Sequence, residues 1–533
     1  MAANGLLQLI ARTGEYQWLE RGLRSGLGEE EITGLVGAAQ PVLVATAYRR
    51  LAAEHAPHRP VLVVMPGMAQ AEKMADDLAN LLGEAEVELF PPLEVLPWEE
   101  TRAPLSVRER RLQVLARLLH KDPFLLVAPV TSLLEPLLPA EYYLRQVLVL
   151  ETGKDMGDLG MGLLAGRLVE WGYERIPQVT APGQFAIRGD ILDIFPPGVQ
   201  LPFRIEFFGT EVDSLRVFDP ESQRSVETRE AVTLLPARET IFPEHDLEAA
   251  LERATRDVEE QLRRLRAEGA EGAAAAMAAR FARHQEQLRE RTGFAGDEQY
   301  RPYFFPRLDS LAAYLPAGSV FLVEPARLAE QSRTFAKEQA QAHASALLRG
   351  AALPSALEGY GDWDRLLAGL KRHPLVYLSS LGRHAPGMQP AVSQSVTSRS
   401  PDPFSGNAGM VVASLKEWQQ QDYRVVLALS QSGRLERLLT ALREEGMVIP
   451  AVADIPADFP AGQAVGVELG LGGGFELSTA RLVVLTDQEL IGRLSRRRSR
   501  RPAGAGQGAG RLHNPLDLAQ GDYVVHVNHG IGQ

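Results

Sequence analysis

The sequence predicts an α/β protein built from several domains. In the first 140 residues, short apolar runs typical of buried parallel strands alternate with helical segments. Residues 184–219 instead alternate apolar and polar side chains with period two, which indicates half-exposed antiparallel strands. A third strand–helix–strand pattern lies within residues 410–492. The length of 533 residues allows about three or four such units.

The first unit is expected to be a doubly wound parallel sheet. Residues 60–66 form an apolar run between two prolines, and residues 69–82 follow with helical spacing. Residues 106–120 predict a basic helix before a second buried strand at 124–130. This alternation of strand and helix predicts the sheet.

A β-rich insertion and a helical hairpin are expected next. The period-two segments, punctuated by Pro196-Pro197-Gly198 and Gly209, predict a small β-rich insertion of about 100 residues. Helical periodicity then returns over 247–265 and 273–292, which predicts an antiparallel hairpin. The apolar run 319–323 predicts a strand that returns to the first sheet.

The last third of the chain predicts a small α/β unit and a linker. Strands are expected over 423–429 and 480–486, with a helix over 434–445. Residues 493–510 are basic and then rich in Gly and Ala, and cannot bury a core. The closing GDYVVHVNHGIGQ starts a strand pattern, so we expect the chain to be the front part of a longer protein.

Composition limits the classes of function. The net charge of −12 argues against nucleic-acid binding as the main role of this chain. The absence of cysteine excludes disulfides, thiolate zinc sites and cysteine nucleophiles. No apolar run approaches the roughly 20 residues of a membrane helix, and the N-terminus lacks a signal peptide. We therefore expect a cytoplasmic protein without a membrane partner.

Residues 37–41, Gly-Ala-Ala-Gln-Pro, lie where a phosphate-binding loop would begin its helix. Such a loop needs glycine amides, a lysine for the β- and γ-phosphates, and a hydroxyl for magnesium. Gly37 is present, but Gln40 carries no positive charge and Pro41 has neither a hydroxyl nor an amide hydrogen. The segment is either a degenerate nucleotide site or an unrelated loop before a helix.

A second segment favours the degenerate site. A metal-binding strand of a nucleotide motor should end in Asp-Glu, and Val323-Glu324 lie in that place. Without the aspartate, magnesium loses its anchor. We therefore predict a retained fold without hydrolysis.

Several long motifs resemble those of UvrB and, more closely, those of the transcription-repair coupling factors. They lie at 89–111, 183–225, 234–239 and 473–492, and in the closing GDYVVHVNHGIGQ. The resemblance covers nearly the whole chain, in order. UvrB itself keeps an intact phosphate loop and an aromatic-rich hairpin, whereas this chain has Gln40-Pro41 and no tyrosine-dense hairpin.

The resemblance implies a multidomain α/β fold that begins with a degenerate, helicase-like, UvrB-like domain. It implies this division of the chain: a UvrB-like domain 1a over 1–140, a UvrA-binding insertion over 141–238, a domain 1b with the hairpin over 239–390, a small separate α/β domain over 410–492, a linker over 493–518, and the start of an RNA-polymerase-interacting domain over 519–533.

The resemblance also implies a function in transcription-coupled nucleotide-excision repair. The full-length family displaces stalled RNA polymerase by ATP-driven translocation on DNA and recruits UvrA. This segment is expected to be the UvrA-recruiting adaptor, with its UvrA-binding face open. We expect no catalytic residue, cofactor or metal here, since ATP and magnesium serve the missing motor. The RNA polymerase β subunit is expected to bind through the truncated last domain, and DNA mainly through the missing motor.

The residues implied to contact UvrA are Arg188, Arg204 and Phe208. Two arginines on neighbouring strands can present planar forks to carboxylates, and an exposed phenylalanine can supply an apolar anchor. Alternatively, Phe208 belongs to the core and the arginines form a solvated face. In that case their local partners would be Asp190, Asp193 or Glu206.

Two other functions remain open: an active UvrB-type ATP-dependent DNA damage-recognition enzyme, and a polymerase-binding module. The first requires tight ATP·Mg binding despite Gln40 and Val323. His526 and His529 are expected to be structural rather than metal ligands. The basic run 496–501 either contacts nucleic acid or polymerase, or is a solvated linker.

Overall fold

The chain divides into two compact units, Met1–Leu494 and Ser495–Gln533, which are described separately. The computed structural model describes residues 3–26, 28–54, 60–120, 124–157, 160–291, 293–492, 524–526 and 530–532.

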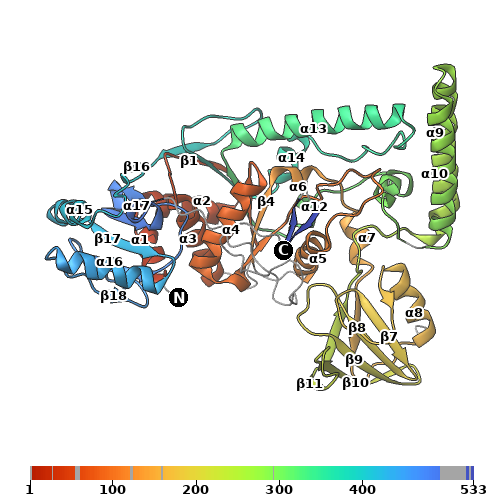
Figure 1. The fold of residues 1–533 in the computed structure, drawn as a ribbon, viewed down its shortest axis with the longest axis horizontal. Helices are drawn as coiled ribbons and strands as arrows, with labels where there is room; N and C mark the ends of the chain where they lie inside the picture. Colours follow the sequence, from red (N-terminus) through yellow and green to blue (C-terminus); the bar gives the residue numbers. More distant parts are fainter. Residues whose placement is uncertain are drawn as a thin grey trace. The chain divides into compact units, whose positions relative to one another are not determined.

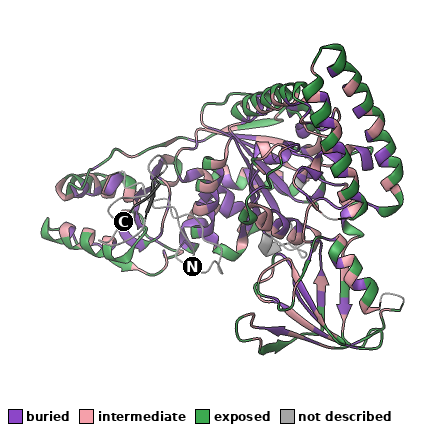
Figure 2. Cartoon of the chain, turned by 45° about the vertical axis from the view of Figure 1, so that its right-hand side comes forward, coloured by how far each residue is buried: buried purple, intermediate pink, exposed green. Residues whose placement is uncertain are grey.

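A seven-stranded sheet organises the first unit (Figure 1). In spatial order its strands are β15 (Val392–Ser395), β1 (Glu29–Thr33), β14 (Leu375–Ser379), β13 (Ser319–Val323), β2 (Val61–Met65), β4 (Leu125–Pro129) and β3 (Val87–Leu89). Every neighbouring pair is parallel. The four central strands are buried at each position, as in a sheet covered on both faces (Figure 2).

Helices cover both faces of this sheet. Successive residues of a strand point to opposite faces, so each strand contributes side chains to two cores. Val61 and Val63 belong to one core, and Leu62 and Val64 to the other. The first core also contains residues of α1 (Asn4–Ala11), α2 (Gly14–Ser25), α3 (Ala39–Glu54) and α4 (Met68–Leu82). The second contains residues of α5 (Leu105–His120), α6 (Val130–Leu134), α7 (Ala140–Leu144), α11 (Arg301–Phe304), α12 (Leu311–Tyr314), α13 (Pro325–Leu348) and α14 (Trp363–Leu370).

The strands expected over 60–66, 124–130 and 319–323 are present in this doubly wound sheet. The strand 319–323 returns to the first sheet as predicted, because β13 pairs with β2; β14 and β15 also pair with β1, so residues beyond 239 complete the sheet begun in the first 130 residues.

The insertion contains a second, six-stranded sheet. In spatial order it consists of β11 (Ser225–Thr228), β10 (Glu211–Phe218), β9 (Phe203–Phe208), β8 (Ile191–Phe195), β7 (Gln184–Arg188) and β6 (Glu174–Arg175). All its pairs are antiparallel except β6–β7. The helix α8 (Met161–Glu170) precedes it, and the strands β5 (Leu148–Glu151) and β12 (Ala231–Leu234) pair at its chain entry and exit.

The hairpin helices α9 (Leu247–Ala267) and α10 (Glu271–Arg289) lie side by side (Figure 1). Each has one apolar stripe in the core, with Leu251 and Val258 on α9 and Met277 and Phe281 on α10. The predicted helical hairpin is therefore present.

A third sheet lies between residues 398 and 486. Its strands in spatial order are β16 (Ser398–Arg399), β20 (Phe475–Leu477), β21 (Leu482–Thr486), β17 (Arg424–Leu429), β19 (Ala464–Glu468) and β18 (Ala451–Val452). The helices α15 (Ala408–Gln420), α16 (Ser432–Glu444) and α17 (Asp487–Leu490) accompany it.

The description of 410–492 as a separate domain is wrong in one respect. Val426, Phe475 and Val484 of this sheet share one apolar core with α1, α3 and α4. The sheet is distinct, but it buries one face against the N-terminal helices and forms part of the same compact unit.

In the second unit, β22 (Val524–His526) pairs antiparallel with β23 (Gly530–Gly532). His526 lies in β22. The predictions for His529, the basic run 496–501 and the linker fall outside the described residues. Among the helices that the structure describes, none is both long and apolar enough to cross a bilayer.

Candidate functional site

The β1–α3 loop occupies the position predicted for a phosphate loop, between a parallel strand and a helix N-terminus. Its backbone amides bond to other parts of the protein. The Val36 amide donates to Ser398 Oγ at 3.0 Å, and the Ala38 amide donates to the carbonyl of Gly473 at 3.1 Å. Gly37 adopts a left-handed φ of 55°, which permits this tight approach.

Gln40 and Pro41 lie in the first turn of α3. The Gln40 side-chain amide folds back and donates to the carbonyl of Leu35 at 3.3 Å, and Pro41 is buried. The loop residues 34–41 therefore carry no cationic side chain that could face a phosphate.

Val323 and Glu324 lie at the same edge of the sheet as this loop. Val323 ends β13 and is buried, while Glu324 adopts a left-handed φ of 54° and its carboxylate accepts the amide of Ser380 at 2.8 Å. The next strand, β14, joins the two segments: Leu378 accepts the Glu324 amide and Ser379 accepts the Gly34 amide. Within the described ranges, no group of three or more His, Asp or Glu side chains is arranged to hold a metal ion.

The three predicted UvrA-contact residues all point to one face of the insertion sheet, which we call the outer face. It is opposite the face whose residues, including Leu192 and Ile205, join the main core. The predicted arrangement on neighbouring strands is wrong, because β8 lies between β7 and β9. Arg188 pairs with Ile191 of β8, whereas Arg204 pairs with Asp193.

Arg204 is bound to its own sheet. Its guanidinium donates to both carboxylate oxygens of Asp193, at 2.7 and 2.8 Å, and lies 4.7 Å from the ring centre of Phe218. The side chain of Asp193 is only 3% exposed. This fork raises the pKa of Arg204 and makes the pair part of the fold, as the alternative of local pairing predicted.

Arg188 and Phe208 are more available. Arg188 ends β7, is exposed, and donates to the carbonyl of Pro177 at 2.6 Å. Phe208 ends β9, with its side chain directed away from the core, and is 81% exposed. A phenylalanine this exposed gains little from burial in the monomer and is available as an apolar anchor for a partner.

Sequence reasoning missed a second pair on the outer face. Glu206 accepts from Ser214 at 2.8 Å and from Arg216 at 3.2 Å, and both are partly exposed. The same period-two alternation contained this signal, since Glu206 stands two residues from both Arg204 and Phe208.

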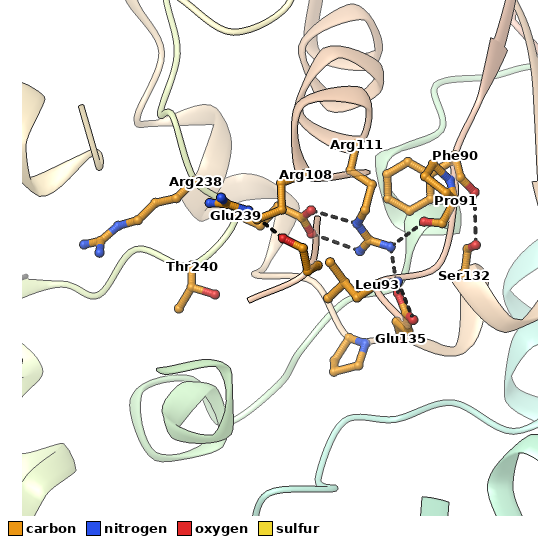
Figure 3. A network of polar contacts seen from close by, with 12 residues as sticks. Phe90, Pro91, Leu93, Arg108, Arg111, Ser132, Glu135, Arg238, Glu239 and Thr240 are labelled. Carbon is orange, nitrogen blue, oxygen red and sulfur yellow. Dashed lines mark hydrogen bonds and ion pairs between the residues drawn. The ribbon is translucent and has the colours of Figure 1, made fainter. Parts of the chain in front are cut away.

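A buried polar network, also missed, fixes the insertion to the parallel sheet (Figure 3). Arg111 of α5 donates two hydrogen bonds to Glu239, at 2.7 and 2.9 Å, and one to Glu135 at 2.6 Å. The Arg111 side chain is fully buried and lies over the ring of Phe90. Burial raises the pKa of Glu135, and Arg111 opposes that shift. The network joins the end of the insertion to the helix that carries Arg111.

A comparison with protein families identifies the kind of domain that the insertion forms. Residues 148–239 match the family model described as the UvrB interaction domain, which spans the six-stranded sheet with the β5–β12 pair.

Proteins named transcription-repair-coupling factor match nearly the whole chain. The Bacillus subtilis protein is 30% identical over 525 residues, covering 98% of this chain and 43% of the relative. The Staphylococcus haemolyticus protein is 26% identical over 515 residues, covering 94% and 41%. The Staphylococcus aureus USA300 protein is 25% identical over 539 residues, covering 99% and 43%. The resemblance inferred from the motifs is confirmed, and the chain spans about two fifths of these relatives.

Proposed function

We propose that this chain serves transcription-coupled repair by recruiting UvrA through the outer face of its insertion sheet. The observation that carries the proposal is the match of residues 148–239 to the UvrB interaction domain, on whose outer face both Phe208, 81% exposed, and Arg188 are exposed. A planar cation and an exposed aromatic ring on one face suit a partner surface that offers carboxylates and an apolar pocket.

In this proposal the chain is an adaptor without its own ATPase. Support comes from the β1–α3 loop, which has a glutamine and a proline where a cation and a hydroxyl are needed. The coupling-factor names of the relatives favour a longer protein that supplies the motor, with its ATP and magnesium, and the contacts with DNA and with the RNA polymerase β subunit. A UvrB-like helicase module and a cytoplasmic location belong to the same proposal.

Binding of purified UvrA, measured by isothermal titration or biolayer interferometry, tests the recruiting role. Arg188→Ala should weaken binding by about tenfold, because one charge-assisted contact contributes about 1.5 kcal/mol or more. Phe208→Ala should weaken it by roughly thirtyfold, as expected for an apolar anchor worth about 2 kcal/mol. Both side chains are exposed, so the fold should tolerate the changes.

Matched controls are Arg263→Ala on α9 and Leu348→Ala at the end of α13, which exchange an exposed arginine and an exposed leucine elsewhere. Both should bind UvrA like the wild type. If the wild type does not bind UvrA, the recruiting role is wrong; if all four variants bind equally, the role survives but the site is wrong.

Direct titration with ATP·Mg separates the adaptor from an active UvrB-type enzyme. If the chain is an adaptor, we expect no saturable binding of ATP·Mg at micromolar concentrations. A Kd of about 1 μM would correspond to a binding free energy of about −8 kcal/mol. Tight binding with hydrolysis would overturn the adaptor and favour the enzyme.

A further inference from the structure

The β1–α3 loop is contacted by another segment of the same chain. Residues 470–474, Gly-Leu-Gly-Gly-Gly, which we call the glycine loop, connect β19 to β20. The carbonyl of Gly473 accepts the Ala38 amide at 3.1 Å. A side-chain carbon built on Gly37 would lie only 2.4 Å from the carbonyl oxygen of Gly474, so the two backbones touch without room for a methyl group.

The glycine loop is also held from α4. The Gly472 amide donates to the Asp77 carboxylate at 2.7 Å, and the Asn80 side-chain amide donates to the carbonyl of Gly470 at 2.8 Å. Between these two contacts, Leu471 is buried in the core shared with the N-terminal helices. Two polar contacts to α4 and one buried leucine therefore hold the glycine loop in place independently of its contacts with the β1–α3 loop.

A third contact closes the opposite side of the β1–α3 loop. The hydroxyl of Ser398 donates to the carbonyl of Gly34 at 2.6 Å and accepts the Val36 amide at 3.0 Å. Ser398 begins β16, which pairs with β20 directly after the glycine loop. Backbone amides that would face a phosphate in a nucleotide-binding loop are thus bonded to two segments of the third sheet.

We propose that the β1–α3 loop is a docking socket for the glycine loop, which closes it to phosphate and couples the third sheet to the parallel sheet. The degenerate loop then has a present function: it binds a carbonyl-presenting segment of its own chain in place of an anionic ligand. This inference does not depend on UvrA binding.

Hydrogen–deuterium exchange of the whole chain tests the socket. Gly37→Ala places a methyl group against the Gly474 carbonyl and strains the left-handed backbone. We expect amides in 34–39 and 470–474 to exchange at least about tenfold faster together, as for a local opening. The control is Gly269→Ala, also at positive φ but with nothing within 4 Å, which should change neither segment.

A milder variant covers the case in which Gly37→Ala fails to fold. Asn80→Ala removes one exposed contact on α4 and should speed exchange of 470–474 by about threefold or more, with the buried amides of β4 unchanged. The proposal is overturned if Gly37→Ala affects only 34–39, or if Asn80→Ala leaves 470–474 at the wild-type rate. It is equally overturned if ATP·Mg or inorganic phosphate slows exchange of 34–39 in the wild-type chain.

Discussion

Replacing Arg204 with alanine should destabilise the insertion sheet itself. Arg204 forms two hydrogen bonds to Asp193, at 2.7 and 2.8 Å, and one to the carbonyl of Gln223 at 3.3 Å. Alanine would leave the Asp193 carboxylate, 3% exposed, without its cation. Loss of binding after this substitution would therefore not by itself locate a contact with a partner.

The expected magnitude follows from burial. Removing one partner of a buried ion pair costs about 3–5 kcal/mol because the other charge stays buried. The Arg204 side chain is 19% exposed, so water relieves part of this cost and we expect about 3 kcal/mol. That corresponds to a roughly hundredfold increase in local opening of the sheet.

Exchange of amides in β8 and β9 measures this opening without requiring the whole chain to unfold in two states. The matched control is Arg216→Ala on the same face, whose partner Glu206 is 29% exposed and whose own side chain is 40% exposed. It should cost under about 1 kcal/mol. Adding Asp193→Asn to Arg204→Ala should restore part of the protection. Equal, small effects for Arg204→Ala and Arg216→Ala would refute the reasoning.

Three further predictions concern buried ionisable side chains. Burial raises the pKa of Asp77 to about 7, so the folded chain keeps a proton that the unfolded chain releases near pH 4. The contribution of Asp77 to stability should therefore fall as pH rises from about 4 to about 7, and Asp77→Asn should remove up to roughly 1.4 kcal/mol per pH unit of that contribution in denaturant melts. Burial lowers the pKa of His284 to about 4, so its own contribution to stability falls as pH drops from about 6.5 to about 4, opposite in sign to that of Asp77; His284→Asn should remove this contribution in the same melts. Arg111→Lys should lower the denaturation midpoint by an amount equivalent to about 2 kcal/mol or more, because a compact ammonium lacks the planar fork that binds both oxygens of Glu239 while reaching Glu135; an unchanged midpoint would contradict this.

The outer face was predictable from the sequence in part. Period-two alternation relates Arg204 to Phe208 within one strand, and the register across β8 shows that Arg188 shares their face. The pairing of Arg204 with Asp193 depends on the register between β8 and β9, which alternation alone does not determine. The sequence analysis therefore singled out the three residues but could not tell which arginine is bound within the sheet.

The strand β1 shows a different limit. Its sequence Glu-Glu-Glu-Ile-Thr opposes the apolar pattern of a parallel strand, and it was not predicted. The charge of the first glutamate, Glu29, is stabilised by two partners. Its carboxylate accepts a hydrogen bond from the hydroxyl of Tyr377 at 2.5 Å and pairs with Lys371 at 2.7 Å. Both partners lie more than 300 residues further along the chain, where no local pattern can indicate them.

Three of the motifs that carry the family resemblance contact distant segments of the chain. Arg111 from 89–111 binds Glu239 from 234–239, and Gly473 from 473–492 binds the β1–α3 loop. Substitution of Arg111, Glu239 or Gly473 should disturb packing between segments, so a loss of partner binding in such a variant would not locate an interface. Arg188 and Phe208 differ, because both are exposed and the Arg188 side chain donates to a backbone carbonyl, that of Pro177, and not to a buried carboxylate. A loss of UvrA affinity in these two variants, with unchanged amide exchange in β8 and β9, would therefore report on the interface rather than on the fold.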